Sequence, residues 1–171
     1  MSSAHDFDFF FGHWRVQHRR LRERLVGCGE WENFEGQCTT WPTLGGQGNV
    51  DDNLLHLPGG DYRAVTLRSF DPTTRHWAIW WLDARQPHQL DVPVIGHFDN
   101  GVGTFYADDT LAGRPIRVRF SWLDTQTPTP RWEQAFSADG GASWEVNWTM
   151  DFERPAGTRP KALIAGTLTP A

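Results

Sequence analysis

The chain has 171 residues, the usual size of one domain, and a formal net charge of −5. This mildly acidic balance argues against nucleic acid as a partner. No apolar stretch approaches the roughly 18 residues that span a bilayer, and the N-terminus lacks the basic segment and apolar run of a secretory signal. We therefore expect a cytoplasmic protein with no membrane partner, whose Cys28 and Cys38 are free thiols.

Apolar alternation over six to ten residues, each time ended by a turn signal, recurs along the chain. The aromatic segment 1–12 precedes it and is expected to hold a short helical piece that closes a barrel. Ten strands are predicted, near residues 13–25, 30–41, 46–55, 62–70, 76–83, 92–98, 103–107, 116–123, 131–137 and 143–154. Turns such as LPGGD, DNG and SADGGAS are typical of hairpins, and GGQGNVDD is interpreted as a bulged strand.

The fold class that follows is all-β, an antiparallel up-and-down barrel of about ten strands. Closure into a barrel removes the exposed edges that a ten-strand meander would otherwise have. Residues 13–154 would form this barrel. Residues 155–171 are expected to be a C-terminal tail with some flexibility.

The stretch RHWAIWWLD is apolar on both faces. In a strand, Trp77, Ile79 and Trp81 share one face, while Trp80 and Leu82 share the other. We expect the first face to line the barrel interior. The second face would lie outside, covered either by a second copy of the chain in a homodimer or by the N-terminal segment 7–11.

The sequence FFFGHWRV places Gly12-x-Trp14 at the start of the first strand. In this respect the chain resembles lipocalin-like, or calycin, barrels. The resemblance implies that Trp14 closes one end of the barrel and that an arginine near the last strand, here Arg154, stacks on its indole.

The stretches FDFFFGHWRV, GGQGNVDD, TLRSFDPTTRHWAIWWLD, IRVRFSW and RWEQAFSADGGASWEVNW extend the resemblance over residues 7–154. They are similar to a family of uncharacterised bacterial lipocalin-like proteins of unknown function. The related nitrobindins bind haem through a histidine late in the chain. Because this sequence has no histidine after His97, haem is not expected, and we predict no cofactor.

The function predicted is binding of a small apolar or aromatic molecule in a tryptophan-lined cavity. Alternation puts the rings of IRVRFSW, RWEQAFS and SWEVNWTMDF on one face and Arg119, Glu133, Asn147 and Asp151 on the other, and which of these four point inward is left open. The candidate ligand-binding residues are Trp14, Glu35, Asn49, Asp51, Trp77, Trp81, Arg119, Gln134, Asn147 and Trp148.

The alternative is a cofactor-independent isomerase, cyclase or hydrolase that uses a carboxylate or histidine in the same cavity. Its candidate catalytic residues are Asp83, Glu133 and His97. An interaction module with exposed rings is a third interpretation. The seven histidines form no H-x-H or H-E-x-x-H arrangement, so no metal site is predicted.

Overall fold

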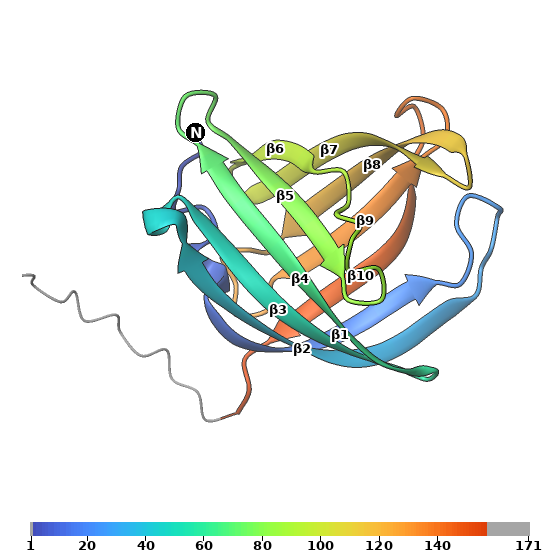
Figure 1. The fold of residues 1–171 in the computed structure, drawn as a ribbon, viewed down its shortest axis with the longest axis horizontal. Helices are drawn as coiled ribbons and strands as arrows, with labels where there is room; N and C mark the ends of the chain where they lie inside the picture. Colours follow the sequence, from blue (N-terminus) through green and yellow to red (C-terminus); the bar gives the residue numbers. More distant parts are fainter. Residues whose placement is uncertain (1, 157–171) are drawn as a thin grey trace, which may run out of the picture.

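A computed structural model of the protein describes residues 2–156, which form a closed barrel of ten antiparallel strands (Figure 1), as predicted. Each strand pairs with the next in sequence, and β10 pairs back to β1, so the sheet has no free edge. The strands are β1 (Gly12–Leu21), β2 (Trp31–Thr43), β3 (Gly48–Leu57), β4 (Gly60–Asp71), β5 (His76–Asp83), β6 (Val94–Asp99), β7 (Val102–Leu111), β8 (Arg114–Leu123), β9 (Arg131–Ser137) and β10 (Glu145–Glu153). Of the predicted tail, 155–171, residues 157–171 lie outside the described residues.

Several strand boundaries differ from the prediction, and two of the differences concern the arginine-rich and glycine-rich stretches. β1 ends at Leu21 and gives way to bends, so the arginine-rich stretch leaves the sheet earlier than alternation suggested. The GGQG stretch is a tight turn rather than a bulged strand, with a 3-10 element η2 (Leu44–Gly46) between β2 and β3. Gly45 and Gly46 have φ of 64° and 93°, values that suit glycine in a turn and cannot continue a strand.

The N-terminal segment enters one end of the barrel, which we call the plugged end. Its only helical part is the 3-10 turn η1 (Asp8–Phe10). Phe7 and Phe10 are 0% and 1% exposed and belong to the core. Since their rings lie inside the barrel, this segment does not cover the outer face of β5, and that version of the prediction is wrong.

Gly12, Trp14 and Arg154 close the plugged end together. The Arg154 guanidinium carbon lies 3.5 Å from the centroid of the Trp14 ring, which confirms the expected stacking. Arg154 also donates to the carbonyls of Phe9 and His13. Gly12 has φ of 103°, which requires glycine, and a Cβ there would lie 2.9 Å from Arg154 Nη1, so a side chain at this position would also displace the guanidinium.

The assignment of faces in β10 is partly wrong. A register shift between Val146 and Trp148 breaks the alternation, because two residues of β10 meet one of β9. As a result Val146 lies opposite Ala135, while Trp148 lies opposite Gln134. The inward face therefore carries Trp148, Met150 and Phe152, as expected, but not Trp144 or Val146.

Candidate functional site

A buried ion pair joins β3 to β4 inside the barrel. Arg68 Nη1 lies 2.6 Å from Asp51 Oδ2 and donates to Asn49 Oδ1 at 2.9 Å. The side chains of Arg68 and Asp51 are 5% and 1% exposed. Three ring centroids lie near the guanidinium carbon: Phe7 at 5.1 Å, Phe10 at 5.3 Å and Trp122 at 5.7 Å. A full positive charge is thus held in an aromatic setting by one carboxylate.

Hydrogen-bond donors outnumber acceptors around this pair. Asp51 Oδ1 accepts from the Asn53 side chain and from the backbone N–H of Thr66, so three donors already use its two oxygens. Among the residues that the structure describes, three other buried nitrogens near it find no acceptor: Arg68 Nε, Asn49 Nδ2 and Trp122 Nε1. A buried donor without a partner costs roughly 1–3 kcal/mol, so such a surplus calls for an explanation.

A cavity of about 30 Å³ lies against the ion pair. Its walls are mainly aromatic and aliphatic, with polar groups at one side. The lining residues are Phe10, Asp51, Asn53, Thr66, Arg68, Ile79, Trp81, Trp122, Trp132, Met150 and Phe152. This volume admits a few atoms of oxygen size, and a larger guest requires a wall residue to move. Trp81 is the partly buried ring of that wall.

His18 lies in a layer of rings between this cavity and the far end of the barrel. Its imidazole stacks on Phe34 at 4.6 Å between centroids and 9° between planes. The Trp148 indole donates from Nε1 to His18 Nδ1 at 3.2 Å. Burial, with a smaller effect from the positive charge of Arg20, lowers the pKa of His18 from 6.5 to about 3. The imidazole is therefore neutral at physiological pH and serves as an acceptor.

This neutral histidine predicts a loss of stability in mild acid. Between pH 6.5 and pH 3 the unfolded chain binds a proton at His18 and the folded protein does not, so the free energy of unfolding falls as pH falls. From pH 7.5 to pH 5 the expected loss is about 2 kcal/mol. Urea denaturation at both pH values measures it. The variant His18→Gln keeps an acceptor for Trp148 and should lack this part of the pH dependence; an equal loss in both proteins would contradict the assignment.

Charged and aromatic groups also meet at the far end of the barrel. The Arg85 guanidinium lies 3.7 Å from the centroid of the Tyr62 ring and pairs with Asp83 at 2.6 Å. Burial acts to raise the pKa of Asp83, but the hydrogen bonds from Arg85 outweigh it and hold that pKa below its usual value. Asp83 is thus an ionised, paired carboxylate rather than a proton donor.

The structure places the predicted ligand-binding residues in four groups. Asp51 and Trp81 line the cavity and Asn49 adjoins it, while Trp148, Gln134 and Asn147 lie nearer the far end, where Gln134 donates to Asn147 at 2.8 Å. Trp14 and Trp77 belong to the packed core at the plugged end. Glu35 and Arg119 lie on the outer wall, because regular alternation in β2 and β8 turns the residues next to them inward. There Arg119 stacks on Trp144, and the Gln17 side chain donates to Glu35.

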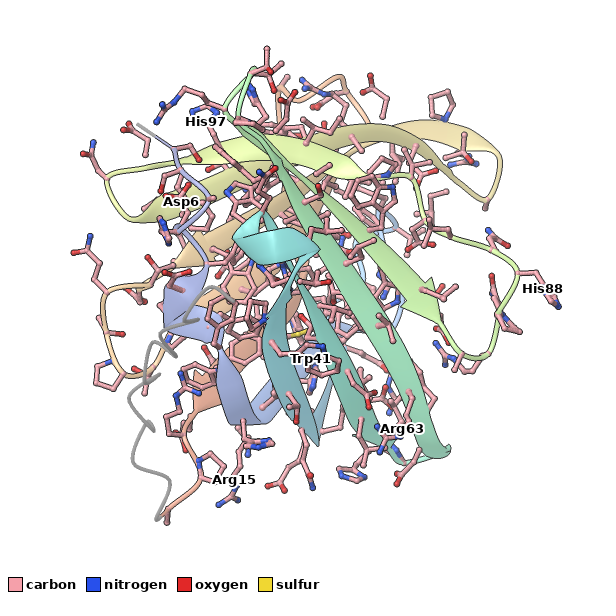
Figure 2. The ribbon with its side chains drawn as sticks, turned by 60° about the vertical axis from the view of Figure 1, so that its left-hand side comes forward. Asp6, Arg15, Trp41, Arg63, His88 and His97 are labelled. Atoms are coloured by element: carbon pink, nitrogen blue, oxygen red, sulfur yellow. The ribbon has the colours of Figure 1, made fainter. Side chains whose placement is uncertain are left out.

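The three predicted catalytic residues do not share a site. Glu133 lies on the outer face of β9, where Arg131 donates to it at 2.7 Å. His97 is exposed on β6 (Figure 2). Its ring centroid lies 5.4 Å from that of His76. Only Asp83 lies on an inward face, at the far end of β5. Strand alternation explains the separation, since residues on opposite faces of the wall cannot meet inside the barrel.

The sequence reasoning missed Arg68 and His18. Both lie on the same face as apolar inward residues. Arg68 shares a face of β4 with Tyr62 and Phe70, and His18 shares a face of β1 with Trp14. A basic residue in phase with a row of rings was the available signal. It was overlooked because charged side chains are most often placed on the wet face.

Comparison with models of known protein families finds no match, and comparison with curated proteins finds no significant match. Within the described residues, no helix is long and apolar enough to cross a membrane. Nor do residues 2–156 contain a group of three or more His, Cys, Asp or Glu side chains that could hold a metal ion.

Proposed function

We propose that this protein, a lipocalin-like barrel, binds a small apolar or aromatic molecule in the cavity beside Asp51 and Arg68. The observation that carries the proposal is the combination of an aromatic cavity with a buried charged pair on its wall. A core built only for stability gains little from such a pair, because apolar residues of the same volume stabilise a fold at least as well. Concave sites with apolar walls and a few fixed polar groups are typical of ligand pockets.

Entry of the ligand requires Trp81 to swing away. This residue is only partly buried, and its ring meets that of Trp148 edge-on at 5.9 Å between centroids. The rest of the wall is held more firmly, since Trp122 and Trp132 are 2% and 7% exposed. Displacing the Trp81 indole joins the cavity to the far end of the barrel and makes room for one aromatic ring.

Titration with acetophenone and with isopropylbenzene, followed by saturation-transfer NMR and calorimetry, tests the proposal. The variant Trp81→Ala removes the wall residue that must move, so it should bind either probe more tightly than the wild type. Trp41→Ala is the matched control, because Trp41 is 45% exposed on the outer wall. Binding of neither probe to wild type or Trp81→Ala would overturn the proposal.

The same proposal includes a cytoplasmic location. Cys28 and Cys38 are both free thiols, which fits a reducing compartment.

Burial, together with the charge of Asp51, raises the pKa of the Cys38 thiol well above its usual value, so this group stays protonated and unreactive.

We also propose that the protein is a homodimer through an outer apolar stripe. We define the stripe as the cross-strand row Trp41, Val50, Leu67 and Trp80, whose members are register partners on β2, β3, β4 and β5. Trp41 and Leu67 are 45% and 39% exposed. Trp41 is labelled in Figure 2. Leu82, expected in the same strip, is half-buried and pairs with Leu90 of the loop that follows β5.

A second copy suits this stripe better than any segment within residues 2–156. The N-terminal segment lies inside the barrel, so it does not cover the stripe. A two-fold axis brings identical residues face to face, and a stripe without charges avoids the repulsion that charged residues would create there. Exposed Ile95, at 52%, and Val65, at 37%, widen the apolar surface on the neighbouring rows.

Trp80→Glu should convert the dimer to a monomer. The substitution places two carboxylates against apolar surface at the interface, which disfavours association by several kcal/mol. Light scattering after size-exclusion chromatography measures the mass. Val102→Glu, at an exposed apolar position outside the stripe, should leave the mass unchanged. A wild type that is monomeric at micromolar concentration, or a dimeric Trp80→Glu, would contradict the proposal.

A further inference from the structure

The surplus of donors beside Asp51 and Arg68 identifies the chemical class of the ligand. Resting on the function proposed above, we infer that the ligand is a neutral aromatic compound that presents a carbonyl oxygen, or an equivalent acceptor, to Arg68 Nε and Trp122 Nε1. Both residues line the cavity, both are more than nine-tenths buried, and neither nitrogen has an acceptor among residues 2–156. An oxygen with two lone pairs can satisfy both donors.

The unpaired groups point to an acceptor and not to a donor. Asp51 already receives three hydrogen bonds, from Arg68, Asn53 and the Thr66 backbone, and the Asn49 side-chain oxygen receives one from Arg68. The buried side-chain atoms that lack partners near the cavity are all nitrogens that donate. A ligand whose polar groups only donate would leave these nitrogens unsatisfied, at a cost to its affinity.

The charge balance points to a neutral ligand. Arg68 is already paired with Asp51, so the two side chains carry no net charge together. A carboxylate placed here would be a third buried charge, next to Asp51 and without a cation of its own, and burial of such a charge is strongly unfavourable. The aromatic walls formed by Trp81, Trp122 and Trp132 complete the requirement by offering faces and edges for a flat ring.

Three probes of nearly one shape separate these requirements: acetophenone, isopropylbenzene and benzoate. Acetophenone carries the neutral acceptor. Isopropylbenzene has a methyl group in place of the carbonyl oxygen, and benzoate has a negatively charged carboxylate. We expect acetophenone to bind at least roughly tenfold more tightly than either of the others, the gain typical of one hydrogen bond to a charged or buried donor. Calorimetry on the wild type and on Trp81→Ala, where the cavity is open, gives the ratios.

The variant Trp122→Phe assigns the preference to the indole donor. It keeps a ring in the wall and removes Nε1, so the ratio of acetophenone to isopropylbenzene affinity should fall several-fold while isopropylbenzene itself binds about as before. Trp132→Phe, in the same wall, is the control and should keep the ratio. Because the readout is a ratio, a general loss of packing does not move it.

The outcomes separate the ligand class from the function. If isopropylbenzene or benzoate binds as tightly as acetophenone, or if Trp122→Phe leaves the ratio unchanged, the inferred class is wrong and the proposed function stands. If none of the three probes binds to wild type or Trp81→Ala, the proposed function fails and the inference fails with it.

Discussion

Replacing Arg68 with methionine is expected to lower the free energy of unfolding by about 3–5 kcal/mol, the usual cost of removing one partner from a buried ion pair. The loss arises mainly from Asp51, whose carboxyl group is 1% exposed and would lose the cation that pairs with it. Methionine retains most of the volume of the arginine stem, so loss of packing against Phe7 and Phe10 contributes less. Urea denaturation followed by tryptophan fluorescence measures the change.

The double variant Asp51→Asn with Arg68→Met separates charge from packing. Asparagine keeps an oxygen that accepts from Asn53 and from the Thr66 backbone, but it carries no charge. The double variant should therefore be more stable than Arg68→Met alone, despite having one more substitution. A double variant that is less stable than the single one would show that the uncompensated carboxylate is not the source of the loss.

Strand alternation and turn chemistry were sufficient to predict the barrel. Ten apolar runs of strand length, separated by short turns, leave few alternatives to a meander, and exposed edges favour closure. The stacking of Arg154 on Trp14 was expected from the resemblance of Gly12-x-Trp14 to lipocalin-like barrels, and the structure contains it.

The interior could be predicted only in part, since it depends on which strands face each other. Trp81 followed from regular alternation, and Asn49 and Asp51 were chosen as polar residues on strands that the meander brings together; all three lie at the cavity or its edge. Arg119 was left open because both a wet outer wall and an inward head-group site suit an arginine in a strand, and its stacking on Trp144 decides for the outer wall.

The bulge in β10 had no reliable sequence signal, and the sequence left two places open for the N-terminal phenylalanines, the end of the barrel and the outer wall. One extra residue between Val146 and Trp148 reverses the faces of everything before it, and nothing in SWEVNW marks that position. The N-terminal phenylalanines could equally have covered the outer wall, because an aromatic segment is drawn to any apolar surface within reach. The interior has room for them beside Trp77 and Phe98, and that three-dimensional fact decides their place.

Phe7→Ala is expected to destabilise the protein by about 3–5 kcal/mol, as large-to-small substitutions of buried aromatic residues do. The ring is fully buried, and its centroid lies 4.9 Å from those of Trp77 and Phe98, both edge-on, and 5.8 Å from that of Trp122. Its removal leaves a cavity that the closed barrel wall cannot collapse to fill, because ten hydrogen-bonded strands fix the radius.

Phe9→Ala is the matched control for this plug, two residues along the same segment. Phe9 is only partly buried. Its ring centroid lies 5.7 Å from that of Trp122, much as that of Phe7 does, but 6.5 Å from that of Phe98, farther than the 4.9 Å of Phe7. It should cost less than half as much as Phe7→Ala, since the cost follows buried area and cavity volume. If the N-terminal segment only leaned on the barrel, both substitutions would cost about 1 kcal/mol or less. Urea denaturation measures both losses of stability. A large loss for Phe7→Ala and a much smaller one for Phe9→Ala would instead identify the segment as part of the core that contacts the guanidinium of Arg68.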